Sequence, residues 1–174
     1  LEINEALLYG DELLVSRLSK NQLENIDSLG ETQSLKGIDL SESIDVVRNI
    51  SRPYHLFSLN NEAIDSDFKL ISKNRNSKTL PSHCKLIGDK KDLFIEEGAE
   101  VLCSTINVTS GPVYIGKNAT IMEGSHLRGP IAICEGSTVK MGAKIYGGTT
   151  IGPYSKVGGE VGNSVIQGYS NKGH

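Results

Sequence analysis

The sequence lacks the features that mark several common functional classes. Its three cysteines, Cys84, Cys103 and Cys134, are scattered and odd in number, which argues against a disulfide framework and favours a reducing, cytoplasmic setting. It contains no run of eighteen apolar residues, so we expect no membrane-spanning helix and no membrane partner. The formal charge is only −3, and no cluster of Lys or Arg stands out. That charge pattern argues against a nucleic-acid partner.

Common catalytic motifs are also missing. There is no Gly-x-x-x-x-Gly-Lys-[Ser/Thr] loop, no Cys-x-x-Cys pair and no nucleophile elbow around a serine. Of the four histidines, only His126 and His174 lie in the glycine-rich C-terminal half. A zinc site needs at least three protein ligands, so we interpret His126 as a surface turn residue and predict no metal site in this half.

Glycine is scarce in the first 80 residues and abundant afterwards. Three of the 19 glycines precede residue 80, and the other sixteen lie between Gly88 and Gly173. Glycine permits the positive φ that tight turns need, so the C-terminal half is expected to turn often.

The same half carries an unbroken six-residue hydrophobic repeat. An aliphatic residue recurs at Ile115, Ile121, Leu127, Ile133, Val139, Ile145, Ile151 and Val157. Four residues after each comes a small or β-branched residue: Ala119, Ser125, Ile131, Ser137, Ala143, Thr149, Ser155 and Val161. A period of six fits neither a helix nor an ordinary strand and is typical of a parallel β-helix. With three hexads to a triangular coil, we expect Ile115, Ile133 and Ile151 to stack in one interior column.

The limits of the repeat predict where the β-helix is irregular. The repeat is already present at Ile95 and Val101, but the step from Val101 to Ile115 is two residues too long. We therefore expect an extra loop around Thr109–Pro112. After Val157 the phase breaks. We predict about four coils within a β-helix domain spanning residues 81–174.

Residues 1–80 predict a small α+β region without the repeat. Residues 6–16 read as two short strands around a Gly10-Asp11 turn. Residues 40–47 fit either a strand or the start of a helix. Residues 58–71 begin like a capped helix, with Ile64, Phe68 and Ile71 on one apolar face, and residues 73–82 read as a linker.

The residues from Ile151 to His174 carry a family resemblance. Glu160-Val161, Ile166 and a Gly/Ser/Lys-rich bend that ends at His174 resemble the segment leading to the catalytic histidine of bacterial bifunctional UDP-N-acetylglucosamine diphosphorylase/glucosamine-1-phosphate N-acetyltransferases. Further likeness lies in Arg52-Pro53, Leu56-Phe57-Ser58-Leu59-Asn60 and residues 94–99. These segments are similar to a divergent branch, in which a sugar nucleotidyltransferase-like domain precedes a left-handed β-helix. Residues 1–80 would then be the C-terminal part of that domain plus a linker.

The resemblance implies a reaction and a set of partners. The reaction is acetyl transfer from acetyl-CoA to the amine of glucosamine 1-phosphate, a step of UDP-N-acetylglucosamine synthesis, with His174 as the general base. Acetyl-CoA would lie between neighbouring subunits of a cytoplasmic homotrimer, and Mg²⁺ would serve the nucleotidyltransferase part. Two basic residues of better-known members are replaced here by Gly158 and Gly162. Lys156 or Lys172 would therefore bind the sugar phosphate.

Three functional hypotheses stay open at this stage. We expect the chain to be an internal fragment of a longer transferase, truncated within the β-helix and inactive alone. Alternatively, the parent is a sugar-1-phosphate nucleotidyltransferase whose β-helix only positions or oligomerises the catalytic domain. A structural trimerisation module without chemistry is the third. Taken by itself, His174 could equally be a polar residue at the chain end, although a histidine can accept a proton near neutral pH.

Overall fold

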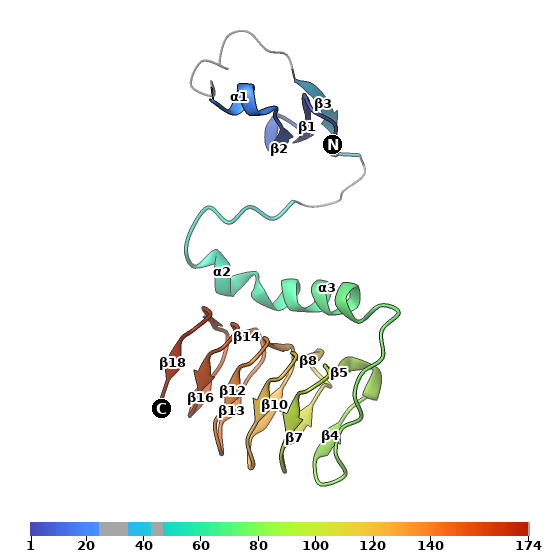
Figure 1. Ribbon diagram of the computed structural model, residues 1–174. Coiled ribbons are helices and arrows are strands. Elements are labelled where there is room, and N and C mark those ends of the chain that lie inside the picture. The colour runs from blue at the N-terminus through green and yellow to red at the C-terminus, as the bar shows by residue number, and fades with distance from the viewer. Residues whose placement is uncertain (25–34, 43–46, 174) are drawn as a thin grey trace. The chain divides into compact units, whose positions relative to one another are not determined.

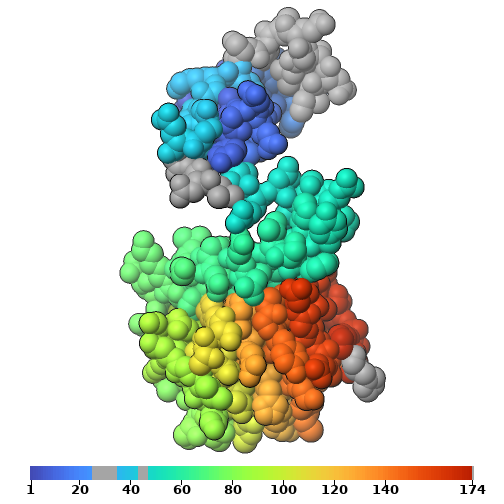
Figure 2. All heavy atoms as spheres, turned by 180° about the vertical axis from the view of Figure 1, so that it is seen from behind, coloured from blue at the N-terminus to red at the C-terminus, as the bar shows by residue number. Residues whose placement is uncertain are grey.

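The computed structural model describes residues 1–24, 35–42 and 47–173. The chain forms two compact units, Leu1–Asn49 and Ile50–His174, each of which is described by itself (Figures 1 and 2). The domain boundary that we predict at residue 80 rests on the change in sequence character, and it stays a prediction. Among the described residues, no helix combines the length and the apolar character needed to cross a membrane.

The first unit contains a three-stranded sheet. Strands β1 (Glu5–Tyr9) and β2 (Glu12–Arg17) pair antiparallel, and Gly10 occupies the turn with a φ of 57°. This confirms the predicted hairpin. Strand β3 (Lys36–Asp39) pairs parallel with β1 and ends before residue 40. We expected a strand or the start of a helix over residues 40–47. Leu40–Glu42 form neither, and residues 43–46 lie outside the described chain.

A short helix, α1 (Lys20–Glu24), follows the hairpin. The Ser19 hydroxyl and backbone N–H both donate to Gln22 Oε1 at 2.8 Å. The pattern is a capping arrangement, in which a glutamine three residues into the helix returns to the cap residue.

The second unit is dominated by a left-handed parallel β-helix, as predicted (Figure 1). Fifteen short strands form three parallel sheets of five strands each. The first sheet contains β4 (Lys85–Ile87), β7 (Thr105–Asn107), β10 (His126–Arg128), β13 (Lys144–Ile145) and β16 (Glu160–Val161). The second contains β5 (Leu93–Ile95), β8 (Val113–Ile115), β11 (Ile131–Ile133), β14 (Thr149–Ile151) and β17 (Val165–Ile166). The third contains β6 (Glu100–Val101), β9 (Thr120–Ile121), β12 (Thr138–Val139), β15 (Lys156–Val157) and β18 (Asn171–Lys172).

The interior columns follow the six-residue repeat. Ile133 pairs with Ile115 in the preceding coil and with Ile151 in the following one, and all three side chains are fully buried. The other two sheets form corresponding columns, one through Leu127 and Ile145 and one through Val139 and Val157. Burying a side chain of this size contributes about 1.5–3 kcal/mol, so the stacked columns stabilise a prism too narrow for a conventional core.

The small residues of the repeat also point inward, at the corners. Their hydroxyls reach carbonyl groups of the next coil: Ser137 Oγ donates to Gly152 O at 2.8 Å, and Ser155 Oγ donates to Gln167 O at 3.0 Å. These bonds satisfy polar groups that would otherwise be buried at a cost. Among the described residues, Thr149 Oγ1 is the one fully buried side-chain oxygen or nitrogen that has no partner.

The β-helix has about five turns rather than the four we expected. An additional coil begins at β4, where the sequence repeat is not yet regular, and the last coil continues beyond the break in phase. The predicted loop lies between β7 and β8, at residues 108–112. The last coil is short, because Val157 pairs with Lys172 only fifteen positions later, whereas Val139 and Val157 are eighteen apart.

Helices α2 (His55–Ser58) and α3 (Asn60–Ser72) precede the β-helix, and α3 packs on the sheet that contains β11 and β14 (Figure 1). Ile64 and Phe68 are buried there, as predicted, whereas Ile71 is partly exposed. The expected N-cap is not formed, since no side chain caps the first turn. Instead, Asn60 donates to Gly148 O at 2.7 Å and accepts from Thr150 Oγ1 at 2.8 Å, so it joins α3 to the β-helix.

Candidate functional site

The three residues predicted to form a site belong to the end of the β-helix. Lys156 lies on β15, with an exposed side chain on the outer face of its sheet. Lys172 lies on the neighbouring strand β18. His174 lies outside the described residues and follows Gly173 directly. Lys156 and Lys172 are therefore brought onto adjacent strands.

Lys172 occupies an unusual place in the prism. It pairs with Val157 and so continues an interior column formed by Val101, Ile121, Val139 and Val157. Its ammonium group turns to Gly158 and donates to the carbonyl oxygen at 3.0 Å. The Gly158 carbonyl oxygen partly replaces water as a hydrogen-bond partner of this ammonium group.

A hollow of about 690 Å³ surrounds Lys156 on the same sheet. We call it the lysine hollow. Its lining residues come from the last four coils: Met122, Thr138, Lys140, Met141, Gly142, Lys156, Gly158, Gly159 and Gly173. Two of these residues are lysines, which make the hollow cationic, and five are glycine or threonine, whose small side chains leave it open. Gly173, the last described residue, forms part of this wall.

Sequence reasoning did not assign Lys140 to the site. Lys140 nevertheless shares the lysine hollow with Lys156. The available signal was register: Lys140 follows Val139, which pairs with Val157, so Lys140 lies beside Gly158 across the sheet. Its position therefore follows from the eighteen-residue coil length.

Gly158 explains why no arginine stands two residues beyond Lys156. A Cβ added to Gly158 would lie 2.8 Å from Gly173 O and 3.1 Å from Lys140 Cδ. A Cβ on Gly162 would lie 3.1 Å from Tyr146 Cβ. At Gly158 a side chain would clash with backbone, so cations at this end of the sheet have to come from Lys140 and Lys156.

Two tyrosines lie at the corner that leads into β15 and β18. Tyr154 and Tyr169 stack with ring centroids 5.4 Å apart, and both have positive φ values, 54° and 58°. The equivalent corner positions of earlier coils are Gly98, Asn118 and Gly136, residues that adopt this conformation more readily. The negative charge of Glu135 is the main cause that raises the pKa of Tyr154.

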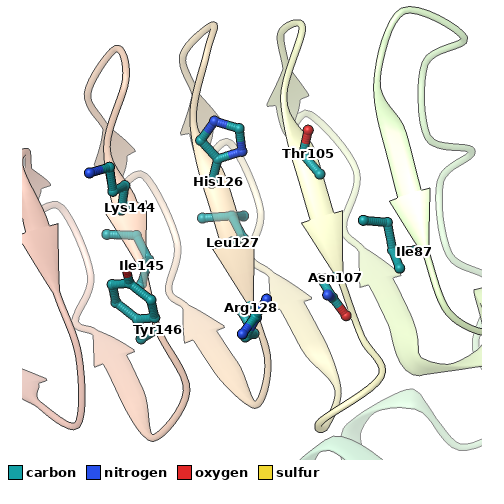
Figure 3. Close-up of a pocket in the computed structure, with 9 residues that line it drawn as sticks. All are labelled: Ile87, Thr105, Asn107, His126, Leu127, Arg128, Lys144, Ile145 and Tyr146. Atoms are coloured by element: carbon teal, nitrogen blue, oxygen red, sulfur yellow. The ribbon is translucent and has the colours of Figure 1, made fainter.

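A second hollow, of about 390 Å³, lies on the sheet of β7, β10 and β13 (Figure 3). Its side chains form two rows across the strands, one with Thr105, His126 and Lys144, the other with Ile87, Asn107, Arg128 and Tyr146. Leu127 and Ile145 lie between the rows and face the interior. Within the described chain, no group of three or more His, Cys, Asp or Glu residues could hold a metal ion, at His126 or elsewhere.

The comparisons with known proteins concern the N-terminal part. Residues 1–76 match a protein-family model described as sugar nucleotidyl transferase. The chain therefore combines a region similar to sugar nucleotidyltransferases with a left-handed β-helix that this family model does not cover. Neither the curated proteins nor the solved structures include a match to the chain.

Proposed function

We propose that this chain is part of a transferase of UDP-N-acetylglucosamine synthesis that acts on sugar phosphates. The observation that carries the proposal is the match of residues 1–76 to sugar nucleotidyl transferases, in the same chain as a β-helix. In this proposal the first region derives from a nucleotidyl-transfer domain, and the β-helix carries acetyl transfer to glucosamine 1-phosphate.

The lysine hollow supports the acetyl-transfer part of the proposal. Lys140 and Lys156 offer two ammonium groups to the sugar phosphate, and none of the described residues that line the hollow is acidic. Lysine ammonium groups bind phosphate well, because they are positively charged and donate hydrogen bonds to its oxygens. Lys172 is less suited to the phosphate, since its ammonium already donates to Gly158 O.

His174 is the proposed general base. The amine nitrogen of the sugar attacks the thioester carbonyl carbon of acetyl-CoA, His174 accepts the amine proton, and the CoA thiolate leaves. The position of Gly173 supports this role, because the residue directly before His174 lies in the wall of the lysine hollow with Lys140 and Lys156. Acetyl-CoA in a cleft between neighbouring subunits of a homotrimer belongs to the same proposal. The Mg²⁺ of nucleotidyl transfer is assigned to no described residue, since none of them form a suitable ligand group.

An assay of thiol release tests the acetyl-transfer proposal. The full-length protein that contains this chain is supplied with acetyl-CoA and glucosamine 1-phosphate, and free CoA is measured. We expect turnover that His174→Ala lowers by at least a hundredfold, since a general base contributes about 10²–10⁴-fold. The matched control, His126→Ala, should retain the wild-type rate. An unchanged rate in His174→Ala would remove this histidine from the mechanism.

A second candidate function is favoured by the crowding at Gly158. A side chain cannot be added at Gly158 without a clash, and the Lys172 ammonium group is hydrogen-bonded to the backbone. Neither position then offers a cation to a sugar phosphate. The β-helix would then only position or oligomerise a sugar-1-phosphate nucleotidyltransferase. Release of pyrophosphate from UTP and a sugar 1-phosphate, without any release of CoA, would favour this candidate.

A further inference from the structure

We propose that the hollow on β7, β10 and β13 is a binding site for a diphosphate group. We call it the cationic groove and define it by Asn107, His126, Arg128, Lys144 and Tyr146 (Figure 3). The groove lies on a different sheet from Lys156, and it is independent of the acetyl-transfer proposal. It goes beyond that proposal because it adds a second anion site.

The strand register brings the polar groups of the groove together. His126 on β10 pairs with Lys144 on β13, and neighbouring strands are about 4.8 Å apart. Arg128 lies two residues beyond His126, on the same outer face and about 6.6 Å along the strand. The register also places it beside Asn107 on β7. The long side chains of Arg128 and Lys144 can therefore reach one ligand of diphosphate size.

The polar side chains of the cationic groove offer hydrogen-bond donors between apolar lining residues. The Asn107 carboxamide oxygen already accepts from the Thr109 backbone N–H at 2.9 Å and from its hydroxyl at 2.7 Å, so its NH₂ group is the part left for a ligand. Arg128 forms no ion pair with any residue in the described ranges, and no Asp or Glu lines the groove. The neighbouring acid, Glu160, is 3.5 Å from Lys144, and both side chains are more than half exposed.

The cationic groove places basic side chains on neighbouring strands. The register sets His126 of β10 directly opposite Lys144 of β13, and Arg128 lies on the same outer face of β10 as His126. The chain as a whole has a net charge of −3, so a basic groove is a local feature and not a consequence of composition. A diphosphate has enough oxygens to accept a bidentate arginine and a lysine together, whereas a single carboxylate has two.

Isothermal titration calorimetry of the protein with inorganic pyrophosphate tests the site. We expect saturable binding that is tighter than for inorganic phosphate and that weakens as salt increases, because exposed charges are screened. Arg128→Gln should weaken pyrophosphate binding at least tenfold, and Lys144→Gln at least threefold. The matched control is Lys117→Gln, an exposed lysine on a corner away from the groove, which should change affinity less than twofold.

Displacement experiments identify which molecule carries the diphosphate, and other outcomes would overturn the proposal. Displacement of pyrophosphate by UDP-N-acetylglucosamine or by CoA would identify the larger molecule that carries the group; displacement by neither would leave free pyrophosphate as the ligand. No saturable binding, or equal weakening by Lys117→Gln and Arg128→Gln, would overturn the proposal. It would also be overturned if Arg128→Gln changed the oligomeric state while pyrophosphate failed to bind, since the groove would then be a contact between copies. Loss of acetyl transfer alone would leave it intact.

Discussion

The middle coils and the last coil of the β-helix differ although they share one architecture. In the middle, each coil takes eighteen residues and its interior holds aliphatic and small side chains without charge, with Ile133 and Ile151 fully buried. In the last coil, the repeat shortens to fifteen residues, Ile166 is only half-buried, and an interior place is taken by Lys172. The regular coils thus keep an uncharged interior, whereas the irregular coil admits a charged side chain at an interior position.

The difference indicates where chemistry can be added to such a prism. A coil that keeps its period has little freedom at interior positions, because any change there alters the packing of two neighbours. Where the period breaks, an interior place can instead be taken by a charged side chain, as at Lys172. The lysine hollow lies at this boundary.

The largest expected effect comes from a cavity in a regular coil. Ile133→Ala should lower the free energy of unfolding by about 2–5 kcal/mol, because Ile133 is fully buried between two other isoleucines. The comparison variant is Ile166→Ala in the last coil, which should cost about 1 kcal/mol because that side chain is already half-exposed. Urea denaturation measures both. Equal losses would contradict the distinction between the coils.

The next effect concerns the attachment of α3 to the coils near the end. Asn60→Ala removes the hydrogen bonds to Gly148 and Thr150 and leaves buried polar groups unpaired, so stability should fall by about 1–3 kcal/mol. Amide exchange should accelerate in α3 more than in the strands of the middle coils. Asn61→Ala, at the exposed neighbouring position, is the control and should have little effect. Uniform acceleration throughout the β-helix would argue against a local clamp.

A smaller effect tests the crowding around Gly158. Gly158→Ala should destabilise the chain by about 1–3 kcal/mol, because the new methyl group would meet Gly173 O and the Lys140 side chain. Gly173→Ala should change stability by less than about 0.5 kcal/mol, since nothing lies within 4 Å of its Cβ position. Thermal unfolding of the two variants gives the comparison. A harmless Gly158→Ala would show that this place has room for a side chain.

The smallest effect is a pH dependence at the opening coils. Partial burial, followed by the hydrogen bond to Glu96 at 2.8 Å, raises the pKa of Tyr114 to about 12. Because the folded pKa exceeds the ordinary value of about 10, the stabilisation is fully present below pH 10 and is lost as the pH rises towards 12. Unfolding free energies measured between pH 9 and 12 should fall more for the wild type than for Tyr114→Phe. Parallel curves would remove this tyrosine as the cause.

The sequence predicted the parts of the fold that rest on local period. Ile115, Ile133 and Ile151 could be placed in one column because a parallel coil repeats its register without a long-range choice. The hairpin around Gly10 and the buried face of Ile64 and Phe68 were predictable for the same reason, since each depends on residues close in the chain. The left-handed winding came from the family resemblance and not from the period.

What the sequence could not supply depends on contacts between distant residues. Asn60 reads as a helix-start residue, yet its partners are Gly148 and Thr150, almost ninety positions away. The crowding of Gly158 by Gly173 follows from the shortened last coil, whose length the repeat does not encode. The grouping of Asn107, Arg128 and Lys144 likewise becomes visible only when the coils are stacked.

The most direct measurement of the proposed site is a titration of the isotopically labelled chain with glucosamine 1-phosphate, followed by amide NMR shifts. The account predicts saturable shifts at Lys140, Lys156 and Gly173, with the middle-coil residue Ile133 unaffected. Lys156→Gln should abolish these shifts. Shifts confined to other parts of the chain, or the same shifts in Lys156→Gln as in the wild type, would contradict the assignment of the sugar-phosphate site to the irregular end of the β-helix.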